Sequence, residues 1–142
     1  MIRAYKKEDI DEIVNLELDT LGTTLGKEML IDNLSNELSY FYVYEENNHI
    51  LGYISISFDG YQGEILNFCV NKDYQHKGIG SKLLNELMNL LIEKGAKSFI
   101  LEVRESNNNA IRLYEKFGFK EISIRKNYYS NLENAKVLLK EV

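Results

Sequence analysis

The clearest hydrophobic pattern in the chain lies between Val70 and Lys94. Apolar residues recur there every three or four positions, which is the spacing of one face of an α-helix. They are Ile79, Leu83, Leu84, Leu87, Met88, Leu91 and Ile92. The pattern predicts a long helix with Gly78 and Gly80 at its N-terminus and Gly95 at its end, the usual place for a terminating glycine.

Two further helices are predicted in the first third of the chain, over Lys7 to Leu18 and Lys27 to Leu38. Gly22 and Gly26 bracket a flexible joint between them. The positions that share a face are Ile10, Ile13, Val14 and Glu17 in the first helix, and Met29, Leu30, Leu34 and Leu38 in the second. A helical pair near the start of a chain often forms a lid over a site.

Short apolar runs bounded by turn residues predict strands. They cover residues 2–5, 40–44, 50–58, 64–70, 98–103, 119–126 and 135–142. Asn47-Asn48 and Asp59-Gly60 are the predicted turns of an antiparallel meander. The crossover through the long helix predicts parallel pairing of strands 64–70 and 98–103. A short helix is expected over Asn108 to Lys116, and Gly118 ends it.

The size and composition of the chain are those of one globular domain. It has 142 residues, 44% hydrophobic and 27% charged, and without an internal linker we expect residues 1–142 to form a single domain. The net charge of −5 opposes nonspecific binding to nucleic acid or to an anionic membrane and suits a cationic substrate.

Cysteine and histidine usage points to a reduced, metal-free protein. The single Cys69 cannot form an internal disulfide, and the N-terminus lacks the apolar core of a signal peptide, so we expect a cytoplasmic location. Two histidines and one cysteine, widely spaced, make no metal site.

An anion site is predicted where the long helix begins. Gly78 and Gly80 have no Cβ, so a ligand can approach the backbone, and the first helical amides have no partner within the helix. Nearby lysines outnumber acidic residues: Lys72, Lys77 and Lys82 against Asp73. This favours a phosphorylated ligand, although an ordinary glycine-rich turn would have the same sequence. Neither a P-loop nor a dinucleotide fingerprint is present.

Four motifs in the second half of the chain occur in a characteristic order. They are Gln75-x-x-Gly78-x-Gly80, Leu101-Glu102-Val103-Arg104, Asn107-x-x-Ala110-Ile111-x-Leu113-Tyr114-Glu115-Lys116-x-Gly118-Phe119, and Arg125-Lys126-Asn127-Tyr128-Tyr129. From about Asn67 to its C-terminus the chain resembles the GNAT superfamily of acyl-CoA-dependent N-acetyltransferases, and within it the ribosomal-protein alanine N-acetyltransferases of the RimI type. The resemblance implies an α/β (α+β) fold: a mixed sheet of about seven strands, mostly antiparallel with one splayed parallel pair, flanked by about four helices.

The resemblance also implies acetyl-CoA as co-substrate and where it binds. Its pantetheine arm would lie along the backbone of Phe68, Cys69 and Val70 as an extra strand. The pyrophosphate would sit on the amides of a continuous run: Gln75, His76, Lys77, Gly78, Ile79, Gly80 and Ser81. Asn107 would reach the cofactor from the other side of the cleft.

Two side chains are implied to be catalytic. Glu102 would act as general base, although its position would equally suit a solvated strand residue or one paired with an arginine. Tyr114 would donate a proton to the CoA thiolate, although it could be a plain core aromatic. Cys69 is a conceivable acyl-carrying nucleophile, but no histidine lies near it in sequence and we expect direct transfer.

The acceptor is less well defined by the sequence. The related enzymes usually carry Pro-Trp in the joint before the second helix, whereas this chain has neither residue and reads Leu21-Gly22-Thr23-Thr24-Leu25-Gly26. Tyr128 and Tyr129 could form the acceptor wall or be structural. The expected acceptor is a protein N-terminus, by resemblance that of a small-subunit ribosomal protein. A small amine or a lysine is the alternative, as is a non-catalytic acyl-CoA-binding module, and we expect a monomer or weak dimer.

Overall fold

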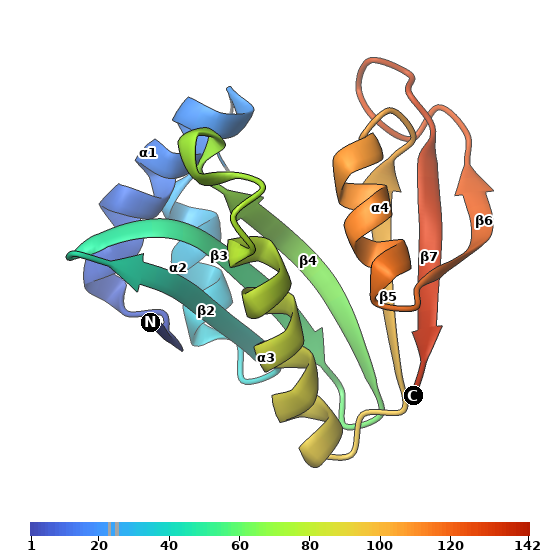
Figure 1. Ribbon diagram of the computed structural model, residues 1–142, viewed down its shortest axis with the longest axis horizontal. Coiled ribbons are helices and arrows are strands. Elements are labelled where there is room, and N and C mark those ends of the chain that lie inside the picture. Colours follow the sequence, from blue (N-terminus) through green and yellow to red (C-terminus); the bar gives the residue numbers. More distant parts are fainter. Residues whose placement is uncertain (23, 25) are drawn as a thin grey trace.

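The computed structural model describes residues 1–22, 24 and 26–142, apart from the side chains of residues 33 and 34. It is built on one seven-stranded sheet of order β1-β2-β3-β4-β5-β7-β6 (Figure 1). The strands are β1 Ile2–Ala4, β2 Ser39–Glu46, β3 His49–Phe58, β4 Gln62–Val70, β5 Ser98–Arg104, β6 Lys120–Arg125 and β7 Ala135–Glu141. All neighbours are antiparallel except β4 and β5. The predicted mixed sheet with one parallel pair is confirmed.

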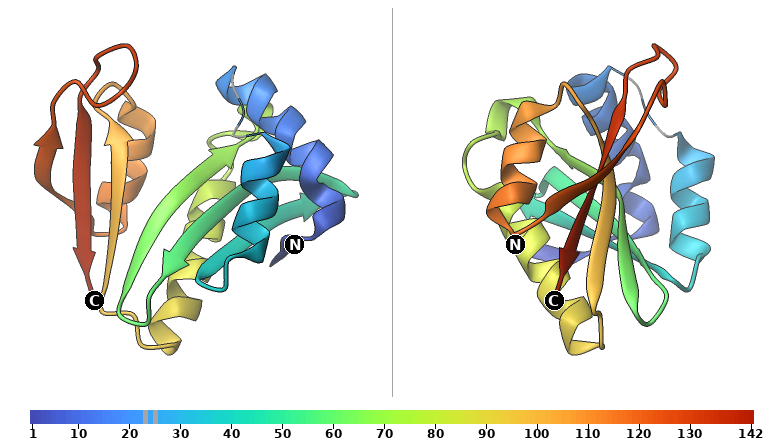
Figure 2. Two further views of the ribbon diagram at one scale, coloured as in Figure 1. Left: turned by 180° about the vertical axis from the view of Figure 1, so that it is seen from behind. Right: turned by 90° about the vertical axis from the view of Figure 1, so that its right-hand side faces the viewer.

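Four α-helices cover the two faces of this sheet, as predicted. They are α1 Ile10–Leu21, α2 Lys27–Ser35, α3 Ile79–Glu93 and α4 Asn108–Lys116. Figure 2 shows α3 and α4 on one face and α1 and α2 on the opposite face. The apolar stripe of α3 is buried against the sheet except for Ile92, which is partly buried.

The predicted turns adopt the backbone conformations that their residues favour. Asn47 and Asn48 both have positive φ (51° and 65°), which is the type I′ hairpin geometry. Gly60 and Gly95 are also left-handed, with φ of 96° and 105°. The meander and the end of α3 therefore lie where the sequence placed them.

The boundaries predicted for the first two helices were wrong. The first extends to Leu21, because Gly22 closes it in a left-handed conformation, and Lys7–Asp9 before it forms a 3₁₀ turn. The second ends at Ser35, because the Asn36 side chain accepts the Leu38 amide and competes with the helix.

The predicted apolar face of α2 was also wrong in part. Met29 and Leu38 are about half exposed, whereas Leu30 is fully buried in the core between α1, α2 and the sheet. The packing predicted for Leu34, and the structure of Thr23 and Leu25 in the joint, lie outside the described residues.

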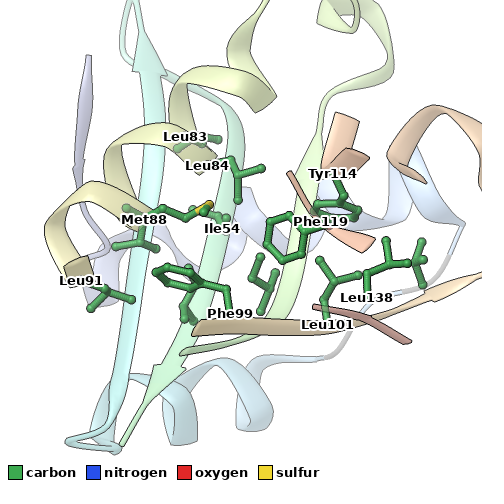
Figure 3. Close-up of a cluster of buried hydrophobic side chains, with 14 of the residues drawn as sticks. Ile54, Leu83, Leu84, Met88, Leu91, Phe99, Leu101, Tyr114, Phe119 and Leu138 are labelled. Atoms are coloured by element: carbon green, nitrogen blue, oxygen red, sulfur yellow. The ribbon is translucent and has the colours of Figure 1, made fainter. Parts of the chain in front are cut away.

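The larger core lies between the sheet and the two helices α3 and α4 (Figure 3). The residues Leu83, Leu84 and Leu91 of α3 are fully buried there, against Ile54 of β3 and Phe99 of β5. This core joins the two halves of the sheet, because α3 packs on β2, β3 and β4 while its last turn leads into β5.

This packing predicts a large cost for opening a cavity under α3. Leu84→Ala should lower the free energy of unfolding by about 2–5 kcal/mol, because the transfer and cavity terms add. Leu18→Ala makes the same change on the exposed side of α1 and should cost less than about 1 kcal/mol. Urea denaturation measures both, and equal costs would contradict the assignment of the core.

Candidate active site

The two halves of the sheet part where β4 carries an extra residue and its pairing with β5 ends. The pairing of β3 with β4 shifts between Ser55 and Ile56, so that Leu66 becomes a bulge. On the other side, the parallel pairing of β4 with β5 ends at Ile65 opposite Leu101. Both strands continue beyond that point, and they diverge toward the top of Figure 1. The splayed parallel pair is confirmed, and the site lies beside it.

A cleft of about 470 Å³ lies next to the diverging part of β4. It runs between the end of β4, the glycine turn before α3, and α4, and we call it the donor cleft. Of the predicted cofactor residues it is lined by Phe68, Cys69, Val70, Gln75, His76, Gly78, Ile79, Gly80, Ser81 and Asn107. Lys77 does not line it, and its ammonium lies 5.3 Å from the centre of the Tyr74 ring instead.

The two glycines of the turn meet different requirements. Gly78 is the N-cap of α3 with φ of 85°, a conformation that L side chains rarely adopt. Gly80 has ordinary helical backbone, but a Cβ there would lie 3.3 Å from the Phe68 ring and 3.5 Å from Leu113. Gly78 therefore shapes the turn, whereas Gly80 keeps α3 close to β4 and α4.

The start of α3 can hold an anion. Lys82 is the first residue whose amide bonds back to the carbonyl of Gly78, at 3.0 Å. The amides of Ile79, Gly80 and Ser81 precede it and have no acceptor within the helix. They line the donor cleft at the positive end of the helix dipole.

Two cations of the donor cleft were missed at the sequence level. Arg112 and Lys116 of α4 line the side of the cleft opposite the glycine turn. They are four residues apart, so they share one face of α4. Asn109, Arg112 and Lys116 are spaced by three and then four residues, and this helical spacing of polar side chains could have identified the two cations from the sequence.

A second cavity of about 330 Å³ opens on the other side of the splay. We call it the acceptor pocket. One wall comes from Glu17 and Leu21 of α1 with Thr24, and the opposite wall contains Glu102 of β5 and Tyr129. Residues that line both cavities are Leu21, Phe68, Asn107, Ala110 and Tyr114. The two cavities therefore meet at Phe68 and Tyr114.

Glu102 both lines the acceptor pocket and pairs with an arginine. Its Oε1 lies 3.3 Å from Nε of Arg125, so the arginine-paired alternative is correct as a description of its contacts. A hydrogen bond with Glu102 also raises the pKa of the Tyr128 hydroxyl. The carboxylate is 30% exposed, and it therefore stays accessible from the pocket.

Tyr114 sits deep between two other aromatic rings. Its ring packs edge-on against Phe68 at 6.1 Å and against Phe119 at 5.6 Å. Burial raises the pKa of its phenol, so the hydroxyl is protonated at neutral pH. The core-aromatic alternative is therefore correct as far as packing goes, and the ring still reaches both cavities.

Cys69 and Asn107 have surroundings that limit their roles. Burial, reinforced by the charge of Glu17, raises the pKa of the Cys69 thiol to about 12. A thiol that stays protonated is a poor nucleophile. The Asn107 side chain caps α4 by accepting the Ala110 amide at 3.2 Å, which leaves its NH₂ group as the donor available to a ligand.

Sequence comparison identifies the family to which this arrangement belongs. The profile of the Acetyltransferase (GNAT) family matches residues 8–119, which is most of the chain. The chain belongs to this GNAT family. It is therefore an acyltransferase that acetylates amines, and acetyl-CoA is its acyl donor.

Among its relatives are protein N-acetyltransferases. A Bacillus subtilis (strain 168) protein with the provisional name ribosomal protein bS18-alanine N-acetyltransferase is 32% identical over 96% of this chain and 92% of its own length. The ribosomal-protein-S18-alanine N-acetyltransferase of Escherichia coli superimposes with a TM-score of 0.92 at 27% identity, covering 100% of this chain and 93% of the other. Ard1 of Thermoplasma volcanium gives a TM-score of 0.92 at 30% identity, covering 100% and 97%.

The donor cleft has the features that acetyl-CoA requires of a GNAT protein. Beyond Ile65 the β4 backbone is no longer paired with β5, so it can pair with the pantetheine amides. Free amides and the cations Arg112 and Lys116 suit the phosphates.

In the part of the chain that the structure describes, no helix is both long and apolar enough to cross a membrane.

The position of Gly80 predicts a specific loss of acetyl-CoA binding. In Gly80→Val the new side chain would crowd Phe68 and Leu113 and narrow the cleft, so binding should be abolished while the fold survives. Asn89→Val places the same residue on the exposed side of α3 and should bind like wild type. Calorimetric titration with acetyl-CoA measures both, and unchanged affinity in Gly80→Val would remove the site assignment.

Proposed function

We propose that this GNAT protein acetylates the N-terminal α-amine of a protein, and that the protein is a ribosomal one. The proposal rests on one observation: a buried phenol, Tyr114, lines both the donor cleft and the acceptor pocket, and a carboxylate, Glu102, lines the acceptor pocket. The names of the Bacillus and Escherichia coli relatives support the choice of acceptor.

The donor substrate would be held mainly by backbone groups. Phe68, Cys69 and Val70 offer the strand that pairs with its pantetheine arm. The amides from Gln75 to Ser81 receive the pyrophosphate, with His76, Arg112 and Lys116 adding positive charge nearby. The Asn107 NH₂ group donates from the α4 side. The thioester carbon would then face the acceptor pocket at Phe68 and Tyr114.

Glu102 would act as general base, directly or through water. The free energy needed to neutralise an α-amine with pKa of about 8 at pH 7 is roughly 1 kcal/mol, against about 5 kcal/mol for a lysine with pKa near 10.4. A carboxylate that needs no unusual basicity is adequate for the first task. Arg125, which pairs with Glu102, would have to yield part of that contact when an ammonium group arrives.

Tyr114 would donate a hydrogen bond, and finally its proton, to the leaving thiolate. The amine nitrogen forms a bond to the acetyl carbon and loses a proton to Glu102, the carbon–sulfur bond breaks, and the Tyr114 phenol gives its proton to sulfur. A model phenol is about 1.5 pK units weaker than a model thiol, so full transfer is uphill by about 2 kcal/mol. Hydrogen bonding to the sulfur as its charge develops is therefore the larger part of its contribution.

The acceptor can be tested with a panel of amines. Ala-starting peptides should be turned over, while polyamines, free lysine and internal lysine peptides should not. Turnover confined to small amines or lysines would overturn the proposed acceptor. Binding of acetyl-CoA without turnover of any amine would indicate that the protein is a non-catalytic acyl-CoA-binding module. We expect a monomer or weak dimer in the assay.

The base role predicts a pH-dependent loss in Glu102→Gln. Turnover should fall by about 10²–10⁴-fold, and most strongly at low pH, where the acceptor amine is more protonated. Acetyl-CoA affinity should barely change. Glu121→Gln removes another ion-paired strand carboxylate, which bonds Lys136 outside both cavities, and should behave as wild type. Wild-type turnover of Glu102→Gln from pH 6 to 9 would leave Glu102 as structure only.

The acid role predicts a loss of turnover without a loss of packing in Tyr114→Phe. The ring and its contacts with Phe68 and Phe119 are kept, so stability should change little, whereas turnover should fall on the order of 10²- to 10⁴-fold. Release of free CoA with an Ala-starting peptide measures the effect. Equal rates for the two proteins at saturating substrate would rule out the proton-donor role.

A further inference from the structure

A buried carboxylate lies on the acceptor side of the site without a part in the proposed chemistry. Glu17, near the end of α1, is only 1% exposed and lies beside the apolar cluster between α1 and the sheet. A carboxylate in such surroundings is costly unless hydrogen bonds satisfy its oxygens. Its position therefore has to be explained by what it binds.

Two hydroxyl groups donate to Glu17 from different parts of the fold. Tyr53 of β3 donates to Oε2 at 2.5 Å, and Thr24 in the joint between α1 and α2 donates to Oε1 at 2.6 Å. Burial and the bond to Glu17 raise the pKa of the Tyr53 hydroxyl, so it remains a donor at neutral pH. Glu17 thereby connects the sheet to the joint.

The connection continues into the next helix. The Gly26 amide donates to Oγ1 of Thr24 at 3.1 Å, and the Gly26 carbonyl accepts the Leu30 amide of α2 at 3.2 Å. A hydrogen-bonded chain thus runs from β3 through Glu17 and Thr24 to the first turn of α2. Leu30 is fully buried, so the far end of the chain is anchored as well.

This series of hydrogen bonds fixes the position of one wall of the acceptor pocket. Leu21 and Thr24 line the pocket on the α1 side, opposite Glu102 and Tyr129. The distance between these walls determines where an acceptor amine lies relative to Glu102 and Tyr114. A misplacement of about 1 Å in such a site can cost as much as 10²-fold in rate.

We propose that Glu17 is a positioning residue for the acceptor, because it connects Thr24, and through Thr24 the start of α2, to the sheet. This proposal rests on the proposed function of the pocket as the acceptor site. Although Glu17 itself lines the pocket, its proposed role is exerted through Thr24 and Tyr53 and not by contact with the amine or the thioester. A purely structural carboxylate would affect stability but would not distinguish the acceptor from acetyl-CoA.

The kinetic test removes the Tyr53 and Thr24 donors one at a time. Tyr53→Phe and Thr24→Val should each raise KM for an Ala-starting peptide on the order of tenfold, with acetyl-CoA affinity within about twofold of wild type. Because both act through Glu17, the double variant should show less than the product of the two effects. If the rise in KM of the double variant equalled the product of the two single rises, each side chain would contact the acceptor separately. That result would overturn the proposal.

Tyr5→Phe is the matched control. Tyr5 belongs to the same aromatic stack, Tyr5–Phe41–Tyr53, and is also buried. Its hydroxyl has no hydrogen-bond partner among the described residues. This variant should leave the KM for the peptide unchanged, and a rise equal to that of Tyr53→Phe would overturn the proposal.

Amide hydrogen exchange tests the connection without any acceptor. In Tyr53→Phe the amides of Thr24 and Gly26 should exchange several-fold faster, although Tyr53 lies on the sheet, and in Tyr5→Phe they should not change. Unchanged exchange in Tyr53→Phe would overturn the proposal. A wild-type protein inactive toward every peptide would instead overturn the proposed function, and the exchange result would then decide only whether Glu17 connects Thr24 to the sheet.

Discussion

The end of pairing between β4 and β5 is the constraint on which the site depends. One extra residue, Leu66, shifts the β3–β4 register, and the parallel ladder stops beside it at Ile65. A continuous ladder would place β5 against the β4 backbone and leave no strand edge for a ligand. The cost of leaving that edge unpaired is acceptable only where a ligand or solvent can satisfy it.

The helices on one face keep the two halves of the sheet together despite this opening. The core under α3 extends from β3 to β5, so the halves are joined where their strands still pair. Beyond that point α3 begins with free amides on one side of the splay, and α4 supplies Tyr114, Arg112 and Lys116 on the other. Fold stability and ligand binding are thus assigned to different ends of the same two strands.

The catalytic roles proposed for Tyr114 and Glu102 rest on a difference in burial between these two side chains. Tyr114 is enclosed by aromatic rings, and burial raises the pKa of its phenol, so it can donate a hydrogen bond at neutral pH. Glu102 also lines the acceptor pocket, where it is partly exposed and paired with Arg125. In the proposed direct transfer, the protonated phenol would serve the leaving sulfur and the accessible carboxylate would serve the incoming amine.

Most of the fold could be predicted because its signals are local. Residues that are adjacent in the sequence determine the apolar period of α3, the Asn47-Asn48 turn and the order of strands and helices. The bulge at Leu66 could not be predicted, because nothing in the sequence of β4 distinguishes it from its neighbours. It exists only through register with β3.

The candidate site divides in the same way. The glycine turn, Glu102 and Tyr114 belong to motifs and could be identified. Glu17 stood out only as a charged residue on an apolar helix face, since its partners Thr24 and Tyr53 are distant in sequence or in the joint. The direction of the Lys77 side chain, which lies over the Tyr74 ring, could not be predicted, because charge near a turn does not fix where a flexible side chain points.

The central claim is that donor and acceptor bind in two cavities that meet at Phe68 and Tyr114, beside the unpaired edge of β4. A crystal structure with a covalent CoA–peptide bisubstrate analogue tests it most directly. The account predicts pantetheine amides bonded to the β4 backbone beyond Leu66, the pyrophosphate on the amides before Lys82, and the peptide between Thr24 and Glu102. An analogue bound elsewhere, or a β4–β5 ladder closed past Ile65, would contradict it.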